Sequence, residues 1–262
     1  IIKVKEPLAE EWGRILLNTN ILCFAHWGGN KRLKEYFDGR KKDGVFVIPY
    51  EELVIDGKSQ VLKEISLCAG ELAAFAGLRY LTKEFGGKGI LPSEAVVQIL
   101  GAGNVGWRAM QILHPIVKTI YFHDIQWEDV YHHSELKNVH CLNSSPEVIS
   151  GFAKKSDIII CAALKKITEP ELKFSAPKLI SSELLRELKE VVIVDVVIDE
   201  GGNCEMSSPK SPEDPVWRLP NNVILYCVPN MPGTVPRSSS VKFSNAVYPL
   251  AKALLKLSDD GV

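Results

Sequence analysis

A glycine-rich turn between an apolar strand and a helix constrains the fold of this chain more than any other feature. Residues 95–100 read AVVQIL and run directly into GAGNVG at 101–106, after which an amphipathic stretch follows. Gly101 permits a tight turn, Gly103 lets the backbone approach a pyrophosphate, and Gly106 lets the helix pack closely on the strand. This G-x-G-x-x-G pattern in this context predicts the first strand, turn and helix of a dinucleotide-binding Rossmann domain.

An acidic residue stands where the next strand ends. The strand TIYFHD at 119–124 closes with Asp124. A carboxylate in this position accepts hydrogen bonds from the adenosine ribose hydroxyls and repels a 2′-phosphate. The helix whose first residues are Asn104 and Val105 offers N–H groups and its positive dipole end to the phosphates. We therefore expect NAD(H) as the favoured cofactor, with NADP(H) as the alternative.

The rest of the chain alternates strand-like and helix-like segments. Such alternation predicts an α/β fold with doubly wound parallel sheets. Further strands are expected at 1–5, 21–26, 45–49, 138–142, 157–161, 191–198 and 223–228, helices at 60–84 and 239–256, and a loop with four prolines at 207–220.

This pattern predicts two domains. Residues 60–235, led by the helix at 60–84, are expected to form the Rossmann domain, and 1–59 with 236–262 a second parallel-sheet domain for the substrate. The chain opens on Ile1 in strand-like sequence, so we expect the second domain to lack its N-terminal part.

Two aspartates interrupt or follow an apolar run. Residues 191–203 read VVIVDVVIDEGGN, with Asp195 and Asp199 before a pair of glycines. A buried carboxylate without partners is costly, and open α/β sheets keep their ligand chemistry at the carboxyl ends of strands. The run therefore indicates either a functional carboxylate at Asp199 or an aspartate that only opens a turn.

Charge and cysteine usage exclude several classes of protein. The 31 basic and 32 acidic residues give a net charge of −1, which does not favour nucleic acid or a membrane surface as a partner. We expect no membrane-spanning helix, because no run of 18 apolar residues occurs. The six cysteines form no C-x-x-C pair, so we expect free thiols in the cytoplasm and no metal site.

Several strings together resemble the alanine dehydrogenase and pyridine nucleotide transhydrogenase family. They are KVKEP at 3–7, ILCFAH at 21–26, YEEL at 50–53, SLCAGELAAFAG at 66–77, GAGNVG at 101–106, VDVVIDEGG at 194–202 and YCVPNMPGTVPRSSS at 226–240. The resemblance covers nearly the whole chain. It implies a flavodoxin-like substrate domain beside the Rossmann domain, a homo-oligomer, and NAD(P)-dependent amination of a 2-oxo acid such as pyruvate or deamination of an L-amino acid.

The resemblance also implies roles for individual residues. Lys5 corresponds to the lysine that holds the oxo acid, His26 to the acid/base histidine, and Asp199 to the aspartate near the reacting carbon. A histidine titrates near neutral pH and suits proton transfer, and a lysine supplies a point charge for a carboxylate. On the cofactor side, the resemblance implies a phosphate contact for Ser66 and a nicotinamide-lining turn at Asn230 and Met231.

Departures from the family pattern fall around the substrate. Trp27 and Asn30 follow the histidine where small apolar residues are usual, and Glu71 replaces an arginine. These three residues are candidates for amine recognition. They leave open an opine-type synthase resembling carboxyethylornithine synthase, which joins pyruvate to a diamino acid, and a saccharopine dehydrogenase-like enzyme. They also leave open an NAD(H)-binding protein without turnover.

Overall fold

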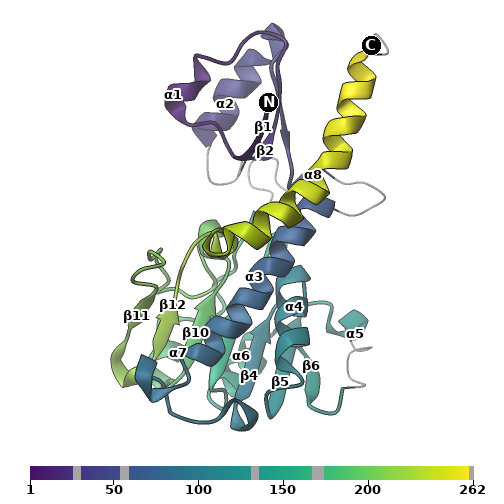
Figure 1. Ribbon diagram of the computed structural model, residues 1–262. Coiled ribbons are helices and arrows are strands. Elements are labelled where there is room, and N and C mark those ends of the chain that lie inside the picture. The colour runs from purple at the N-terminus through teal and green to yellow at the C-terminus, as the bar shows by residue number, and fades with distance from the viewer. Residues whose placement is uncertain (26–30, 54–58, 131–135, 167–173, 260–262) are drawn as a thin grey trace. The chain divides into compact units, whose positions relative to one another are not determined.

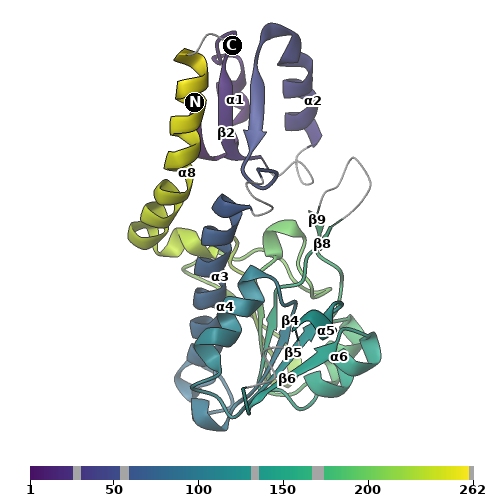
Figure 2. The same ribbon diagram turned by 90° about the vertical axis from the view of Figure 1, so that its right-hand side faces the viewer.

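A computed structural model describes the chain as two compact units, which we treat separately (Figures 1 and 2). The described residues are 1–25, 31–53, 59–130, 136–166 and 174–259. The first unit is assembled from Ile1–Ile65, Lys166–Phe174 and Arg237–Val262, and the second from Ser66–Lys165 and Ser175–Pro236. The division between the units therefore falls within the long helix α3 (Gln60–Arg79), six residues later than the boundary expected at 59/60.

Among the described residues, the second unit is built on a seven-stranded sheet. Its strands are β4 (Val96–Leu100), β5 (Thr119–Asp124), β6 (Val139–Asn143), β7 (Ile158–Cys161), β10 (Val192–Asp195), β11 (Val216–Arg218) and β12 (Ile224–Tyr226). They lie in the order β11-β12-β10-β7-β4-β5-β6, and all neighbours are parallel except β11 with β12. Counted from β4, the parallel strands have the order 3-2-1-4-5-6 of a Rossmann sheet, so the predicted fold class is confirmed.

Helices cover both faces of this sheet (Figure 1). On one face lie α3 and α4 (Asn104–Leu113), and on the other α6 (Pro146–Ala153) and α7 (Ser182–Glu187). The short helix α5 (Trp127–Val130) follows β5. Strands covered on both faces read as continuous apolar runs, which explains IIIC in β7 and VIVD in β10.

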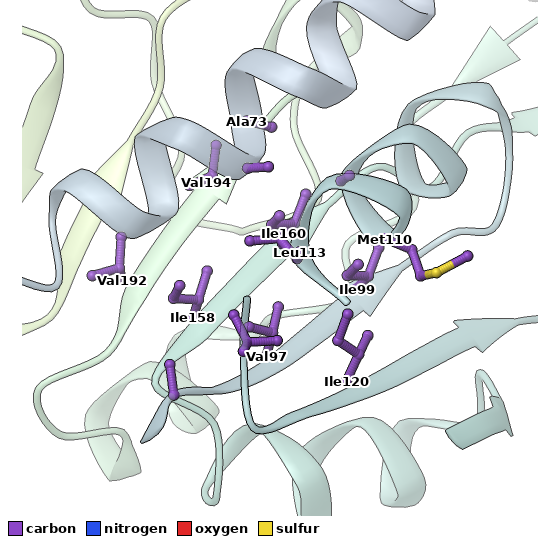
Figure 3. Close-up of a cluster of buried hydrophobic side chains, with 14 of the residues drawn as sticks. Ala73, Val97, Ile99, Met110, Leu113, Ile120, Ile158, Ile160, Val192 and Val194 are labelled. Atoms are coloured by element: carbon purple, nitrogen blue, oxygen red, sulfur yellow. The ribbon is translucent and has the colours of Figure 1, made fainter. Parts of the chain in front are cut away.

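Successive strand residues supply the two hydrophobic clusters on opposite faces of the sheet. In β7, Ile158 and Ile160 belong to the cluster under α3 and α4, whereas Ile159 belongs to the cluster under α6 and α7. Figure 3 shows the first cluster, where Ala73 of α3 and Met110 of α4 lie over the strand residues. The pairing register of the sheet thus follows from its alternating apolar side chains.

The helix predicted at 60–84 is shorter than expected. It ends at Arg79, and a short 3-10 helix at Lys83–Phe85 follows. The reason is that the glycines after this segment fold back on the helix end. The Gly87 N–H donates to Thr82 O at 2.9 Å, and a Cβ on Gly87 would lie 2.0 Å from Tyr80 O.

Two other predicted boundaries are wrong. The strand expected at 191–198 ends at Asp195, because the carboxylate of that residue binds the backbone of the following loop. The proline-rich stretch 207–220, expected to be only a loop, contains the antiparallel edge strand β11 directly after Pro215. Proline is tolerated beside an edge strand, so the composition did not reveal it.

The described part of the first unit contains a three-stranded parallel sheet in the order β1-β2-β3. Its elements are β1 (Ile2–Lys5), α1 (Ala9–Trp12), β2 (Asn20–Phe24), α2 (Lys31–Arg40), β3 (Phe46–Pro49) and α8 (Pro236–Asp259). Trp12, Leu33 and Phe37 cover one face, and the start of α3 with Phe243 and Val247 of α8 covers the other. The two-residue strands β8 (Lys165–Lys166) and β9 (Phe174–Ser175) pair with each other in a two-stranded sheet.

Two buried polar side chains, Gln98 of β4 and His123 of β5, contact each other on neighbouring strands of the seven-stranded sheet. The Gln98 amide donates from Nε2 to Ile149 O at 3.0 Å and contacts His123 Nε2 at 3.1 Å. His123 Nδ1 lies 2.9 Å from Asn143 O. These partners leave Nε2 as an acceptor and Nδ1 as a donor, which is the neutral imidazole. Burial accordingly lowers the pKa of His123 below its ordinary value.

We expect this pair to make stability depend on pH. Since the folded pKa of His123 lies below the unfolded value of about 6.5, the unfolded state binds the proton first, and stability is lost as pH falls below about 6.5. Thermal unfolding between pH 7.5 and 5 measures the loss. It should shrink in His123→Gln and persist in His140→Gln, which alters an exposed histidine of β6. An equal loss in His123→Gln and the unchanged protein would rule out this account.

Candidate functional site

Each of the three glycines in the turn between β4 and α4 lacks a side chain for a different structural reason. Gly101 has a φ of 102°, and a Cβ there would lie 2.8 Å from backbone atoms of Ala162 and Ala163. A Cβ on Gly106 would lie 1.8 Å from Gly101 O. Gly103, by contrast, is exposed, and a Cβ there would meet no described atom within 4 Å. Packing within the protein therefore requires Gly101 and Gly106, whereas the bare backbone at Gly103 leaves room for a ligand.

The same turn forms the N-terminus of α4. Gly103 is the N-cap and has no side chain with which to cap the helix, and Asn104 beside it is exposed. Val105 is half-buried, and its carbonyl packs on Gly70 of α3, where a Cβ would lie only 2.2 Å away. An uncapped helix start with a positive dipole end suits a phosphate group.

Asp124, at the carboxyl end of β5, is tied to the glycine turn. Its Oδ2 accepts a hydrogen bond from the Ala102 N–H at 2.7 Å, and its Oδ1 accepts one from the Gln126 N–H at 2.9 Å. Each carboxylate oxygen has a second lone pair with which to accept from a ribose hydroxyl. Asp124 and Gly103 are thus brought to the same end of neighbouring strands, and together they fit a dinucleotide.

Asp199 and Asn230, predicted separately, are in direct contact. Asp199 lies in a short 3-10 helix (Ile198–Glu200) after β10, is exposed, and accepts a hydrogen bond from the Asn230 N–H at 2.9 Å. Asn230 follows β12 with a left-handed φ of 49°, directly before a second 3-10 helix (Met231–Thr234). Because β10 and β12 are neighbours, this pair lies at the same carboxyl edge of the sheet as the glycine turn.

The buried carboxylate of the apolar run is Asp195. Its Oδ1 accepts from the Asn203 N–H at 3.2 Å, and its Oδ2 accepts from the Cys204 N–H at 3.1 Å and the Ser207 hydroxyl at 2.5 Å. Burial raises the pKa of the Asp195 carboxyl above its ordinary value, although these three donors counteract the rise. These hydrogen bonds of Asp195 therefore stabilise the loop that carries Asp199.

The other predicted residues of the second unit are partly or fully buried. Met231 is 3% exposed and packs in the cluster under α3, so it supports the turn after Asn230. Ser66 is half-buried in α3. The carboxylate of Glu71 pairs with Arg108 of α4, whose Nη2 lies 2.6 Å and Nε 3.2 Å from Oε2. This ion pair ties α3 to α4 beside the glycine turn.

In the first unit, polar groups lie where the parallel strands end. Lys5, the exposed last residue of β1, is in register with Phe24 of β2. The Ala25 N–H, just beyond β2, donates to Glu51 Oε1 at 2.9 Å, just beyond β3. Lys5 and Glu51 therefore lie at the same carboxyl edge of this sheet. The predicted residues His26, Trp27 and Asn30 lie outside the described residues.

The described ranges give no indication of a metal centre or a membrane span. Within them, no three histidine, cysteine or acidic side chains come together as metal ligands, and no helix combines the length and apolarity needed to cross a membrane. All six cysteines are free thiols. Burial raises the pKa of Cys23 and of Cys227 to about 12, which keeps both thiols protonated and unreactive.

The family model, a sequence relative and a solved structure all relate this chain to alanine dehydrogenases. The family described as alanine dehydrogenase/PNT, C-terminal domain, matches residues 73–262. An alanine dehydrogenase of Mycobacterium tuberculosis is 32% identical, covering 100% of this chain and 70% of the relative. A solved L-alanine dehydrogenase has a TM-score of 0.82 at 28% identity, covering 99% of this chain and 71% of that one. A transhydrogenase from Sinorhizobium meliloti shares the fold, with a TM-score of 0.77 at 20% identity over 98% of this chain and 74% of its own.

The Rossmann order, the glycine turn and these relatives define an oxidoreductase that binds a nicotinamide nucleotide. The chain belongs to the alanine dehydrogenase/PNT family. The resemblance noted in the sequence is therefore confirmed.

Proposed function

We propose that this protein is an NAD(H)-dependent amino-acid dehydrogenase with alanine dehydrogenase chemistry. It would aminate a 2-oxo acid such as pyruvate and deaminate the corresponding L-amino acid. The observation that carries the proposal is the shared carboxyl edge of one sheet. There Gly103 leaves open space, Asp124 is held beside the glycine turn, and the Asp199–Asn230 pair lies at the ends of two further strands.

Each residue has a defined part in this proposal. Bound NAD(H) supplies or accepts the hydride. The Lys5 ammonium neutralises the carboxylate of the oxo acid, and His26 transfers the proton to or from the substrate oxygen or nitrogen. The Asp199 carboxylate stabilises positive charge on the substrate nitrogen. The Asn230 N–H fixes one oxygen of that carboxylate and so its direction.

The contributions from the first unit rest on the resemblance. Lys5 lies on the polar edge of its own sheet, as the proposal requires. Trp27 and Asn30 remain candidates for selecting the amine. The ion pair of Glu71 with Arg108 favours a structural part for Glu71. We further propose that the protein is a homo-oligomer, as the resemblance implies.

The test is to follow NADH absorbance in the presence of pyruvate with ammonia, and separately with ornithine or lysine. We expect oxidation with ammonia. Oxidation only with a diamino acid would replace the proposal with an opine-type synthase. Saturable NADH binding without oxidation by any combination would show a binding protein that lacks turnover.

A further inference from the structure

A chain of direct contacts links the glycine turn to the loop that carries Asp199. The turn packs on the segment after β7, because a Cβ on Gly101 would lie 2.8 Å from backbone atoms of Ala162 and Ala163. This segment leaves the sheet at the point between β4 and β7 where the strand order reverses. In open α/β sheets, ligands bind in the crevice at this point.

The segment after β7 is held by one buried side chain, Asn203. The Ala163 N–H donates to Asn203 Oδ1 at 3.0 Å, and Asn203 Nδ2 donates to Ala163 O at 3.0 Å and to Pro177 O at 2.8 Å. Asn203 is 0% exposed. Its amide therefore pairs with both polar groups of Ala163 in the way that a neighbouring strand would.

Asn203 is in turn fixed by Asp195. The Asp195 carboxylate accepts a hydrogen bond from the Asn203 N–H, and the backbone of Gly202 lies against the same carboxylate. Gly202 has a φ of 77°, and a Cβ there would lie 2.7 Å from Asp195 Oδ2. The Asp195 carboxylate thus holds the backbone of Asn203, and the side-chain amide of Asn203 binds Ala163 beside the glycine turn.

We infer that Asn203 is a positioning residue for the dinucleotide, acting through Ala163 on the side of the crevice next to β7. The inference rests on the proposed NAD(H) site. The adenosine half is served by Asp124 on β5, on the opposite side of β4. Loss of the Asn203 amide therefore weakens contacts beyond the adenosine and leaves the adenosine half in place.

The test compares NADH with AMP, which carries only the adenosine half and one phosphate, in Asn203→Ala. We expect the dissociation constant for NADH to rise about tenfold, because displaced binding groups lose contacts worth this much, while that for AMP changes less than about twofold. The matched control is Asn138→Ala. Asn138 also donates from Nδ2 to two backbone carbonyls, His114 O and Val117 O, but lies before β6 at the other edge of the sheet.

The outcomes separate this inference from the function on which it rests. A loss of NADH affinity in Asn203→Ala no greater than in Asn138→Ala, or an equal loss for AMP, would overturn it. If the unchanged protein does not bind NADH, the proposed function fails and the inference falls with it. Should Asn203→Ala not fold, Asn203→Ser keeps one hydroxyl donor and is judged by the same comparison.

Discussion

Replacing Asp199 by Asn is expected to lower the rate of NADH oxidation by about a hundredfold or more while leaving NADH affinity close to unchanged. The amide Oδ1 of the new side chain can still accept from the Asn230 N–H, so the loop keeps its anchor. The negative charge that we propose lies near the substrate nitrogen is lost, and loss of one group that stabilises charge in the transition state typically costs about 10²–10³-fold. Steady-state rates with pyruvate and ammonia, together with NADH titration, measure the two effects.

The control for this change is Glu200→Gln, which removes the same charge one residue further along the same 3-10 helix. We expect its rate to remain within a few-fold of the unchanged protein. A similar rate in Asp199→Asn and Glu200→Gln would show that Asp199 has no part in the chemistry. A parallel fall in NADH affinity would assign it to cofactor binding instead.

The second large effect separates two glycines of the same turn. In Gly106→Ala, the new Cβ would lie 1.8 Å from Gly101 O, so the turn must shift, and we expect a loss of about 3 kcal/mol in the free energy of unfolding. For a chain of this size, this lowers Tm by roughly 6–12 °C. In Gly103→Ala, the new methyl group meets no described atom, and the loss of stability should stay below about 1 kcal/mol.

Affinity for NADH should follow a different pattern. We expect Gly103→Ala to weaken NADH binding about tenfold or more, because the methyl group occupies space that the pyrophosphate needs. Thermal unfolding and NADH titration of both variants give the comparison. Unaltered NADH binding in Gly103→Ala would mean that the open space at Gly103 is not the phosphate site.

Local sequence patterns were sufficient to predict the parallel strands of both sheets and the glycine turn, but not the antiparallel edge strand β11. The β4 strand, the turn and Asp124 could be located because each depends on residues adjacent in the chain. The end of β10 could not, since it depends on Asp195 binding Asn203, Cys204 and Ser207, eight to twelve residues later. A pattern of apolar residues contains no information about which later donors satisfy a carboxylate.

Contacts between segments far apart in the chain also could not be predicted from the sequence. The departure of Glu71 from the family pattern suggested a place in the substrate site, whereas the structure pairs its carboxylate with Arg108 on another helix. Asn203 was passed over, since an asparagine after two glycines reads as a turn residue. Its signal was present in VVIVDVVIDEGGN only as a polar residue that follows a buried aspartate.

We propose above all that the carboxyl edge of the seven-stranded sheet binds NAD(H) at Gly103 and Asp124. The most direct measurement is a fluorescence titration of the unchanged protein with NADH, with Gly103→Ala titrated beside it. We predict saturable binding to the unchanged protein and binding at least about tenfold weaker in the variant. Absence of saturable NADH binding to the unchanged, folded protein would contradict the claim.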